Sequence, residues 1–461
     1  MACSSLTFAS VASDIGLEES DLDALQEACS TEDFGAGDFL ERIWPLIVSL
    51  AAQNDNKTDS EPARLPRGKA GCVHVPRCTV AAILARAFMG KHGVAFNFVP
   101  LFAVPADDAR RPVAVAKIRC MLAYFKAIYV DGGEASRLLE GAVTFTRVHE
   151  AVAPGEFWTQ AHDVRVAQAQ LWDGRMEDDD DDDVEEEMAL VDFANRDLLR
   201  GDAEASATQE EVLFSTRPEL FAAVMIIERL EAEDAVLFEG CRRFSNYTGY
   251  GASFRYAPLP HSTDMIVRDA PPIVAMDAHV NTGGSQFAPH AALADLHKAH
   301  IAFRAAAKLR TRISTGLWGC GAFGGDACFK LCQQLMAAAV AGVGLRFSAR
   351  GRARHAIERV NAVANGRTVA ELAACVLVLD NSGGSDVDEM RVQLLRPGGF
   401  QALAEHRLGG MPAPPPSSAE EREARVLVAE AAAAELAGDA DRAVHRYRRA
   451  LKLFPDLAAE L

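Results

Sequence analysis

The chain contains 461 residues, of which 49% are hydrophobic and 24% charged, and its formal net charge is -18. This composition is typical of a globular protein with room for about two or three domains. The negative balance argues against direct DNA binding, because affinity for nucleic-acid phosphates comes from clustered Lys and Arg. No stretch reaches the ~18 apolar residues that a membrane span requires, and residues 1–19 show no targeting signal, so we expect no membrane association.

The cysteines and the acidic residues do not indicate a metal site. The ten cysteines are scattered, without a CxxC pair or a closely spaced Cys/His set, which is typical of reduced thiols in the nucleus or cytoplasm. An acidic run occupies residues 177–183 and resumes at 185–187. Such a run is usually a solvated loop or an interaction tail. A site for a metal or a basic partner is the alternative, but consecutive aspartates provide no fixed coordination geometry.

The front part of the chain reads as helical. Apolar residues recur at helical spacing in 39–50, 79–89 and 118–128, and this pattern predicts an all-helical region. A short strand is then expected at 143–147. After the acidic segment, the apolar run MALVDFA at 188–194 predicts a buried strand.

Strands and helices alternate in the middle of the chain. The pattern predicts helices at 218–230, 328–341, 352–364 and 369–378, and strands at 235–239, 273–276 and 344–348. This alternation is typical of an α/β layered sandwich.

The C-terminal part reads as an appendage. Residues 409–418 (GGMPAPPPSS) form a proline-stiffened linker. Residues 419–461 carry two helical stretches hinged at 438–439, and the second resembles the second helix of a tetratricopeptide repeat. Because one repeat cannot bury a solenoid core, this hairpin is expected either to dock on the body or to bind a protein partner.

The most suggestive polar cluster is Gln209, Glu210 and Glu211, which follows a loop and begins a helical stretch. Taken alone, two glutamates in a first turn often only complement the helix dipole. Their neighbours favour a site, since Asp192 and Asn195 end the predicted buried strand upstream. Ligands of α/β sheets gather beyond the carboxyl ends of strands, where these segments are expected to converge.

The order of four motifs carries a family resemblance. DFAN (192–195), QEE (209–211), YTGY (247–250) and WGCGAFGGD (318–326) resemble the successive motifs of the poly(ADP-ribose) glycohydrolase catalytic domain. The similarity extends through the helical stretches upstream and covers about residues 39–348. It implies a macrodomain-like three-layer sandwich with a mixed sheet, preceded by an α-helical accessory domain and followed by the C-terminal helical hairpin.

The resemblance also implies a division of the chain and an activity. We expect a helical accessory domain with a flexible N-terminus at 1–140, a catalytic domain at 141–408, the linker at 409–418 and the hairpin at 419–461. The implied reaction is hydrolysis of the ribose-ribose O-glycosidic bond of poly(ADP-ribose), a glycosidase activity that needs no cofactor and no metal. Two further expectations are a protein partner that binds the C-terminal hairpin and a location in the nucleus or the cytoplasm.

Residue roles follow from the matched motifs. Glu211 would act as general acid and base, Glu210 would hydrogen-bond the ribose hydroxyls, and Asp192 would support the site. Burial beside the charge of Glu210 would raise the pKa of Glu211 for that role. Substrate contacts are implied for Met176, Glu177, Asn195, Gly201, Gln209, Tyr250, Leu317, Trp318, Gly319, Cys320, Gly321 and Ala322. Plain packing is the alternative for Tyr247 and Tyr250.

The chain departs from the family in its phosphate loop. Leu199, Arg200 and Gly201 stand where the family carries three consecutive glycines. If the backbone there needs positive φ, Leu199 is strained by ~1 kcal/mol or more. Arg200 could pair with a phosphate, whereas Asp202 and Glu204 would repel it.

Two further positions differ from the family. Leu317 replaces an asparagine before WGCG, and residues 348–351 (SARG) lack a stacking aromatic. The leading interpretation is an active glycohydrolase. The alternatives are a catalytically weakened module that binds ADP-ribose and a scaffold.

Overall fold

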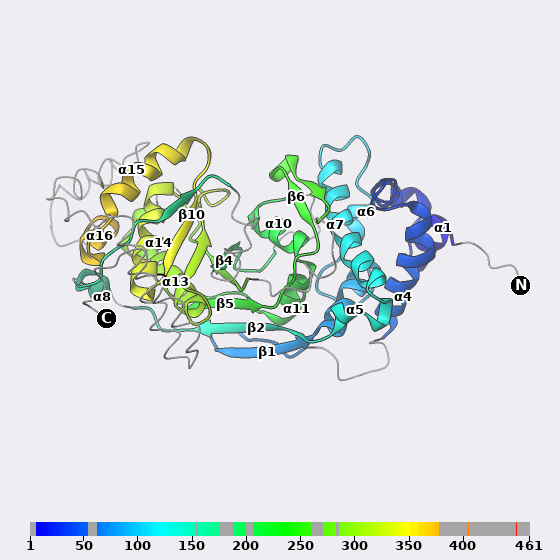
Figure 1. The fold of residues 1–461 in the computed structure, drawn as a ribbon, viewed down its shortest axis with the longest axis horizontal. Coiled ribbons are helices and arrows are strands. Elements are labelled where there is room, and N and C mark those ends of the chain that lie inside the picture. The colour runs from blue at the N-terminus through cyan, green and yellow to red at the C-terminus, as the bar shows by residue number, and fades with distance from the viewer. Residues whose placement is uncertain are drawn as a thin grey trace, which may run out of the picture. The chain divides into compact units, whose positions relative to one another are not determined.

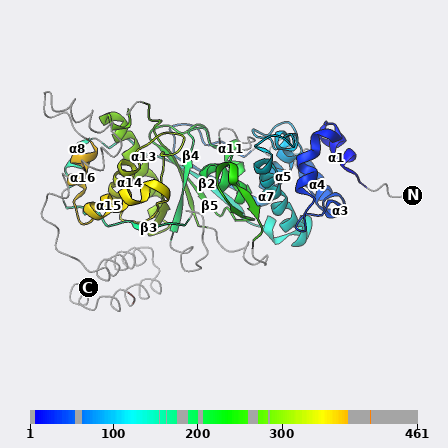
Figure 2. The same ribbon diagram turned by 90° about the horizontal axis from the view of Figure 1, so that it is seen from above.

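The computed structural model describes residues 6–53, 62–153, 155–161, 163–174, 188–199, 206–259, 271–282 and 285–377, together with the single positions 404 and 449. The chain divides into two compact units. Unit 1 consists of residues 1–150 and 192–277, and unit 2 of residues 151–191 and 278–461. Figures 1 and 2 show their elements in two views.

Unit 1 begins with a helical part. Its elements are α1 (Phe8–Ile15), η1 (Glu19–Leu22), α2 (Asp23–Ala28), α3 (Ala36–Asp38), η2 (Phe39–Ile43), α4 (Trp44–Ala52), α5 (Arg77–Phe88), α6 (Val99–Phe102), α7 (Arg111–Val130), η3 (Gly133–Ala135) and η4 (Arg137–Leu139). α4 packs against α5 and α7 (Figure 2). Their core is aromatic, with Phe88 contacting Phe102 and Phe125 at ring-centroid distances of 4.9 and 5.7 Å. The helices predicted at 39–50, 79–89 and 118–128 are confirmed.

The rest of unit 1 is mostly strand. It contains β1 (Gly71–Pro76), β2 (Ala142–His149), α10 (Gln209–Thr216), η5 (Pro218–Ala222), α11 (Ala223–Ile226), β5 (Asp234–Glu239), β6 (Asn246–Thr248), η6 (Gly251–Ser253), β7 (Arg255–Ala257) and β8 (Ile273–Asp277). β1, β2, β5 and β8 pair antiparallel in that order. β6 and β7 form a separate hairpin.

Unit 2 contains the parallel strands. Its elements are α8 (Gly155–Thr159), β3 (Gln170–Trp172), η7 (Ser285–Phe287), α13 (Pro289–Ala307), β9 (Arg312–Thr315), α14 (Ala327–Ala341), β10 (Gly344–Ser348), η8 (Gly351–Ala353), α15 (Arg354–Ala364) and α16 (Val369–Val376). β9 pairs parallel with β10, and β10 pairs parallel with β3. α14 packs against α13, α15 and α16 (Figure 1).

The main sheet has eight strands in the order β1-β2-β5-β8-β4-β9-β10-β3, where β4 is Met188–Ala194. Residues 188–190 of β4 pair parallel with β9. An apolar run such as MALVDFA is typical of a parallel strand covered on both faces, and β4 is buried along nearly its whole length. The mixed sheet with helices confirms the predicted α/β fold.

Two predictions about individual elements are wrong. The front part is not all helical, because β1 pairs with β2 at one edge of the sheet. Pro76 is tolerated there because an edge strand leaves one row of backbone groups without a partner strand. The helix predicted at 218–230 is the shorter pair η5 and α11, and the backbone becomes extended at Ile227 (φ -94°, ψ 116°).

Several expectations fall on residues that the structure does not describe. The acidic run and the linker lie outside the described residues, and so does the hairpin apart from the helical position 449. Those expectations, like the expected domain boundaries, stay predictions. Within the described ranges, no helix is long and apolar enough to cross a bilayer.

Candidate active site

The end of β4 and the beginning of α10 meet in unit 1. Asp192 is fully buried near the end of β4, and α10 begins at Gln209. The Phe193 N–H donates a 2.7 Å hydrogen bond to Oε1 of Gln209. The side chain of Gln209 therefore fixes the first residue of the helix to the strand that carries Asp192.

Glu210 binds the loop that leaves β4. Its Oε1 accepts a hydrogen bond from the Leu199 N–H at 2.8 Å, and its Oε2 accepts one from the Asn195 N–H at 3.3 Å. The residue is only 5% exposed. Burial raises the pKa of Glu210 well above its usual range, and the neighbouring charges of Asp192 and Glu211 raise it further against the opposing effect of the two N–H donors.

Glu211 lies in a different environment. Its Oε2 accepts hydrogen bonds from the Thr208 N–H at 2.8 Å and from the Thr208 hydroxyl, and the Ser206 hydroxyl is 3.5 Å from Oε1. Thr208 is the N-cap of α10 and Glu211 is its third residue, so this carboxylate reaches back to the cap as in a capping box. The two adjacent glutamates thus accept hydrogen bonds from different donors. Glu210 accepts from backbone N–H groups of the loop, and Glu211 accepts from the N-cap residue of the helix.

Leu199 adopts the left-handed conformation. Its φ is +55°, the only positive value among the described residues other than glycine. This conformation costs about 1 to 2 kcal/mol for a residue with a Cβ. The positive φ on which the predicted strain at Leu199 depends is present, and the strain itself stays a prediction. The side chain is only 2% exposed, so its burial offsets part of that cost.

The helical part of unit 1 packs against α10 through α7. One hydrophobic cluster joins α7, the residue before Thr208, α10 and the β6–β7 hairpin; it consists of Val113, Ala116, Cys120, Ala207, Val212, Tyr247 and Phe254. Tyr247 is therefore a packing residue, whereas Tyr250 is 58% exposed. Gly249 shapes the turn between them, because a Cβ at this position (φ +74°) would lie 1.7 Å from the Ser253 carbonyl oxygen.

Unit 2 carries the glycine-rich turn after β9. The Gly325 N–H donates to the Gly319 carbonyl at 2.8 Å and closes the turn. Gly319 has φ +73°, and an added Cβ would lie 2.8 Å from the Ala278 Cβ. Gly321 and Ala322 are exposed, and within the described part of the chain their N–H groups donate to no protein acceptor. These amides are available to an external anion.

A buried lysine lies under this turn. The Lys330 ammonium forms an ion pair with Asp295 of α13 and lies 4.3 Å from the ring centroid of Trp318. Its Cε would be 3.2 Å from a Cβ at either Gly319 or Gly325. Lys330 therefore joins α13, α14 and the turn. Burial also raises the pKa of the Cys320 thiol in this turn to about 12, so that thiol is neutral.

The predicted site residues fall into three groups. Unit 1 brings Asp192, Asn195, Gln209, Glu210 and Glu211 together, and it also contains Tyr250. Unit 2 contains the predicted turn residues Leu317, Trp318, Gly319, Cys320, Gly321 and Ala322. Met176, Glu177 and Gly201 lie outside the described residues. The described residues contain no group of three or more His, Cys, Asp or Glu side chains that could hold a metal ion.

Sequence reasoning missed three contributors. Thr208 and Ser206 donate to Glu211, and Lys330 underlies the glycine-rich turn. The spacing T-x-x-E from Thr208 to Glu211 is a recognisable capping-box signal and could have revealed the role of Thr208. No local pattern marks Lys330, because its partner Asp295 lies 35 positions away in the chain.

Two family models match the chain. The model described as "Poly (ADP-ribose) glycohydrolase (PARG), helical domain" matches residues 32–147, and the one described as "Poly (ADP-ribose) glycohydrolase (PARG), Macro domain fold" matches residues 161–356. Together they cover more than half of the chain. The chain belongs to the poly(ADP-ribose) glycohydrolase family.

Individual relatives are consistent with this membership. Poly(ADP-ribose) glycohydrolase 1 of Arabidopsis thaliana is 30% identical over 251 residues, 51% of this chain and 43% of the relative. The poly(ADP-ribose) glycohydrolase 1 of Caenorhabditis elegans is 28% identical over 290 residues, which are 59% of this chain and 35% of the relative. The probable poly(ADP-ribose) glycohydrolase 2 of Arabidopsis thaliana is 26% identical over 340 residues, which cover 59% of this chain and 62% of the relative. The chain thus spans less than two thirds of each relative's length.

Proposed function

We propose that this protein is a poly(ADP-ribose) glycohydrolase that hydrolyses the ribose-ribose O-glycosidic bond and releases ADP-ribose. The observation that carries the proposal is the pair Glu210 and Glu211 on the first turn of α10, beside the buried Asp192. Neighbouring carboxyl groups in different environments are the arrangement that glycoside hydrolysis uses, because one reaction needs both a proton donor and a negative charge.

In this proposal Glu211 is the general acid and base. It protonates the leaving ribose oxygen and then takes the proton of the attacking water. Thr208 supports this role by holding one carboxylate oxygen of Glu211 at the helix cap. The positively charged oxocarbenium-like transition state is stabilised by the one negative charge that Glu210 and Asp192 share.

Glu210 and Asp192 have supporting roles. Glu210 orients the ribose hydroxyls and fixes the loop from Asn195 to Leu199, and its raised pKa keeps the pair with Asp192 from carrying two negative charges. Tyr250 is exposed and lies against the bound nucleotide. The exposed amides of the glycine-rich turn bind the diphosphate, as backbone N–H groups in such turns do. Met176, Glu177 and Gly201 complete the proposed contacts.

The test is release of ADP-ribose from labelled polymer by the purified full chain. Glu211→Gln removes the proton donor and keeps the size of the side chain, so we expect kcat to fall about 10²- to 10⁴-fold. Ser215→Ala is the matched control, because Ser215 is one turn further along α10 and, among the described residues, its hydroxyl donates to the Glu211 backbone carbonyl and not to its carboxyl group. Equal and negligible release by wild type and Glu211→Gln would refute the proposal.

Calorimetry with ADP-ribose separates an enzyme from a module that only binds. Tight binding of ADP-ribose by the wild type without turnover would show that the protein is a module that only binds, and not a hydrolase. Absence of both binding and turnover would exclude the two functions together. The partner role of the C-terminal hairpin stays a separate proposal, to be tested by deleting residues 409–461 and measuring whether turnover is retained.

A further inference from the structure

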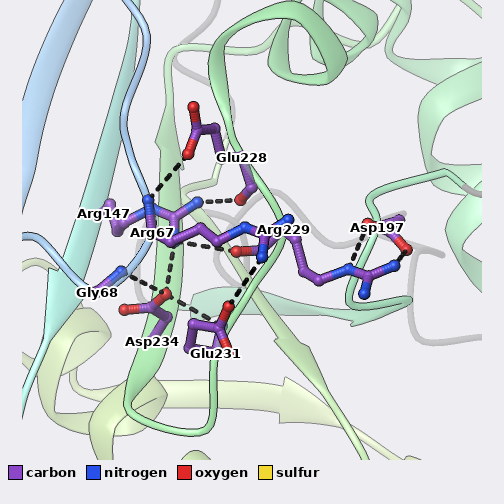
Figure 3. A network of polar contacts seen from close by, with 8 residues as sticks. All are labelled: Arg67, Gly68, Arg147, Asp197, Glu228, Arg229, Glu231 and Asp234. Atoms are coloured by element: carbon purple, nitrogen blue, oxygen red, sulfur yellow. Dashed lines mark hydrogen bonds and ion pairs between the residues drawn. The ribbon is translucent and has the colours of Figure 1, made fainter.

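The loop from Asn195 to Leu199 is also held by an arginine. The Nε and Nη2 atoms of Arg229 donate to Oδ1 and Oδ2 of Asp197 at 2.8 and 2.5 Å. Figure 3 shows Arg229 extending from its own segment toward Asp197. Beside this fork, the Leu230 N–H donates to the Arg196 carbonyl at 2.7 Å. The loop is thus bonded through both its backbone and a side chain.

Asp197 is in turn bonded to the residue that binds Glu210. The Asp197 N–H donates to Oδ1 of Asn195 at 3.2 Å, and the Asn195 N–H donates to Glu210. A continuous series of hydrogen bonds therefore runs from Arg229 through Asp197 and Asn195 to the Glu210 carboxyl group.

The segment that carries Arg229 is itself anchored to the sheet. Arg147 of β2 is fully buried and donates to Oδ2 of Asp234 at 2.5 Å and to the carbonyls of Glu228 and, at 3.3 Å, Arg229. The same Asp234 oxygen accepts the Glu231 N–H at 3.0 Å. This network surrounds the segment in Figure 3. The guanidinium of Arg229 therefore projects from a fixed base.

Backbone hydrogen bonds to Leu65 form a second attachment of the segment. The Glu228 N–H donates to the Leu65 carbonyl at 3.2 Å, and the Leu65 N–H donates to the Ile226 carbonyl at 2.7 Å. Residues 226–231 are thus fixed between the strands β2 and β5 and the backbone around residue 65.

The loop needs such a restraint because one of its residues is strained. Leu199 has φ +55°, and its N–H in that conformation donates to Glu210. A backbone in a sparsely populated region persists only where its surroundings over-determine it. Relaxation of Leu199 would withdraw its N–H from Glu210 and let that carboxyl group turn.

We propose that Arg229 and Asp197 are positioning residues for Glu210, acting through residues 195–199 after β4. The inference rests on the proposed function, because it assigns these residues an effect on turnover. A bidentate guanidinium–carboxylate pair fixes direction as well as distance, which a single lysine bond does not. The pair is partly exposed, so it contributes little to overall stability. Its removal therefore changes the site more than the fold.

The first test compares Arg229→Met, Arg229→Lys and Asp197→Asn in the full chain. Misplacing a catalytic group by a fraction of an ångström lowers rates steeply, so we expect kcat of Arg229→Met to fall about tenfold with little change in KM or in the melting temperature. Arg229→Lys restores part of the loss. Combining Arg229→Met with Asp197→Asn lowers kcat by less than the product of the two single effects, because both substitutions weaken the same ion pair.

Arg67→Met is the matched control. Arg67 forms an ion pair with Glu231 of the same segment at 3.6 Å and is similarly exposed, but its guanidinium has no bond to the loop (Figure 3). The backbone N–H of Arg67, which binds the Glu228 carboxylate, is unchanged in this variant. We expect its kcat to equal that of the wild type.

Hydrogen exchange separates this inference from the proposed function. In Arg229→Met, the amides of residues 195–199 exchange about tenfold faster, while Arg67→Met leaves them unchanged. One outcome is that the wild type releases no ADP-ribose while hydrogen exchange of residues 195–199 still depends on Arg229. In that case the hydrolase proposal fails, but the restraint of the loop by Arg229 stands. Unchanged exchange in Arg229→Met, or an active wild type whose kcat that substitution does not lower, overturns the inference.

Discussion

The turn at 317–325 in unit 2 and the loop at 195–199 in unit 1 both contain left-handed backbone, but they use different residues for it. Gly319 and Gly324 supply the positive φ in the first, and at Gly319 a side chain would also collide with Ala278. In the second, Leu199 adopts φ +55° despite its Cβ. A buried carboxylate, Glu210, accepts its N–H, and the leucine side chain is buried.

The difference shows what a glycine motif does and does not encode. In unit 2 two of the glycines are needed for space, because a Cβ at Gly319 would meet Ala278 and Lys330, and one at Gly325 would meet the Gly319 carbonyl and Lys330. In unit 1 the conformation is imposed by hydrogen bonds from outside the loop. A conformation that depends on such bonds is more easily disturbed at a distance than one that depends on glycine.

The largest expected effect breaks the support of the glycine-rich turn. Lys330→Met leaves the buried carboxylate of Asp295 without its cation, so the free energy of unfolding should fall by about 3 to 5 kcal/mol. Chemical denaturation measures it. Adding Asp295→Asn should recover much of the loss, and Lys308→Met, an exposed lysine at the end of α13, should change little. Equal stability of Lys330→Met and Lys308→Met would contradict the role given to Lys330.

A smaller effect is expected at Gly319 itself. Gly319→Ala places a Cβ 2.8 Å from Ala278 in a left-handed conformation, so strain and overpacking together should cost about 2 to 4 kcal/mol. Gly321→Ala in the same turn is the control, since its Cβ meets nothing within 4 Å and its φ is not positive. Urea unfolding of both variants should separate them, and the prediction fails if they are equally stable.

The buried carboxyl group of unit 1 should make stability depend on pH. The pKa of Glu210 is higher in the folded than in the unfolded chain, so its contribution is full below the unfolded pKa and is lost as the pH rises through the folded value. Glu210→Gln imitates the protonated form and should remove this loss. Its melting temperature relative to wild type should therefore increase with pH. A constant difference between pH 4 and pH 9 would show that Glu210 titrates normally.

The smallest expected effect tests the strain at Leu199. Both Leu199→Ala and Leu199→Gly lose the buried side chain, but only glycine relieves the positive φ, so Leu199→Gly should be the more stable by about 1 kcal/mol. At Leu198, which is buried without a positive φ, the order should reverse and alanine should be the more stable. The same order at both positions would argue against strain at Leu199.

Parts of this site were predictable because local sequence determines them. The apolar run MALVDFA predicts β4 with the bounds that the structure has, and it places Asp192 near the end of that strand and Asn195 directly after it. The departure from glycine at Leu199 predicted a strained backbone if φ is positive there, and φ is +55°. The helical spacing of apolar residues likewise predicted α5, α7 and α14.

Other parts depend on contacts that no local pattern encodes. Arg229 and Asp197 are 32 positions apart, and nothing in either neighbourhood indicates the other. β1 was missed because its six residues, GCVHVP, are short and end in proline. α13 was missed because its many alanines blur the difference between its faces; it is buried along most of its length. Polar pairs between distant elements appear only once the elements are packed.

The most direct measurement of the central claim is polymer cleavage by the wild type beside Leu199→Gly. In our proposal, Glu210 and Glu211 remain a working site although Leu199 stands where the family carries glycine. Single-turnover assays with labelled poly(ADP-ribose) should show cleavage by both proteins, with rates within about tenfold of each other because the external hydrogen bonds already impose the required backbone. Cleavage by Leu199→Gly alone, with an inactive wild type, would contradict it.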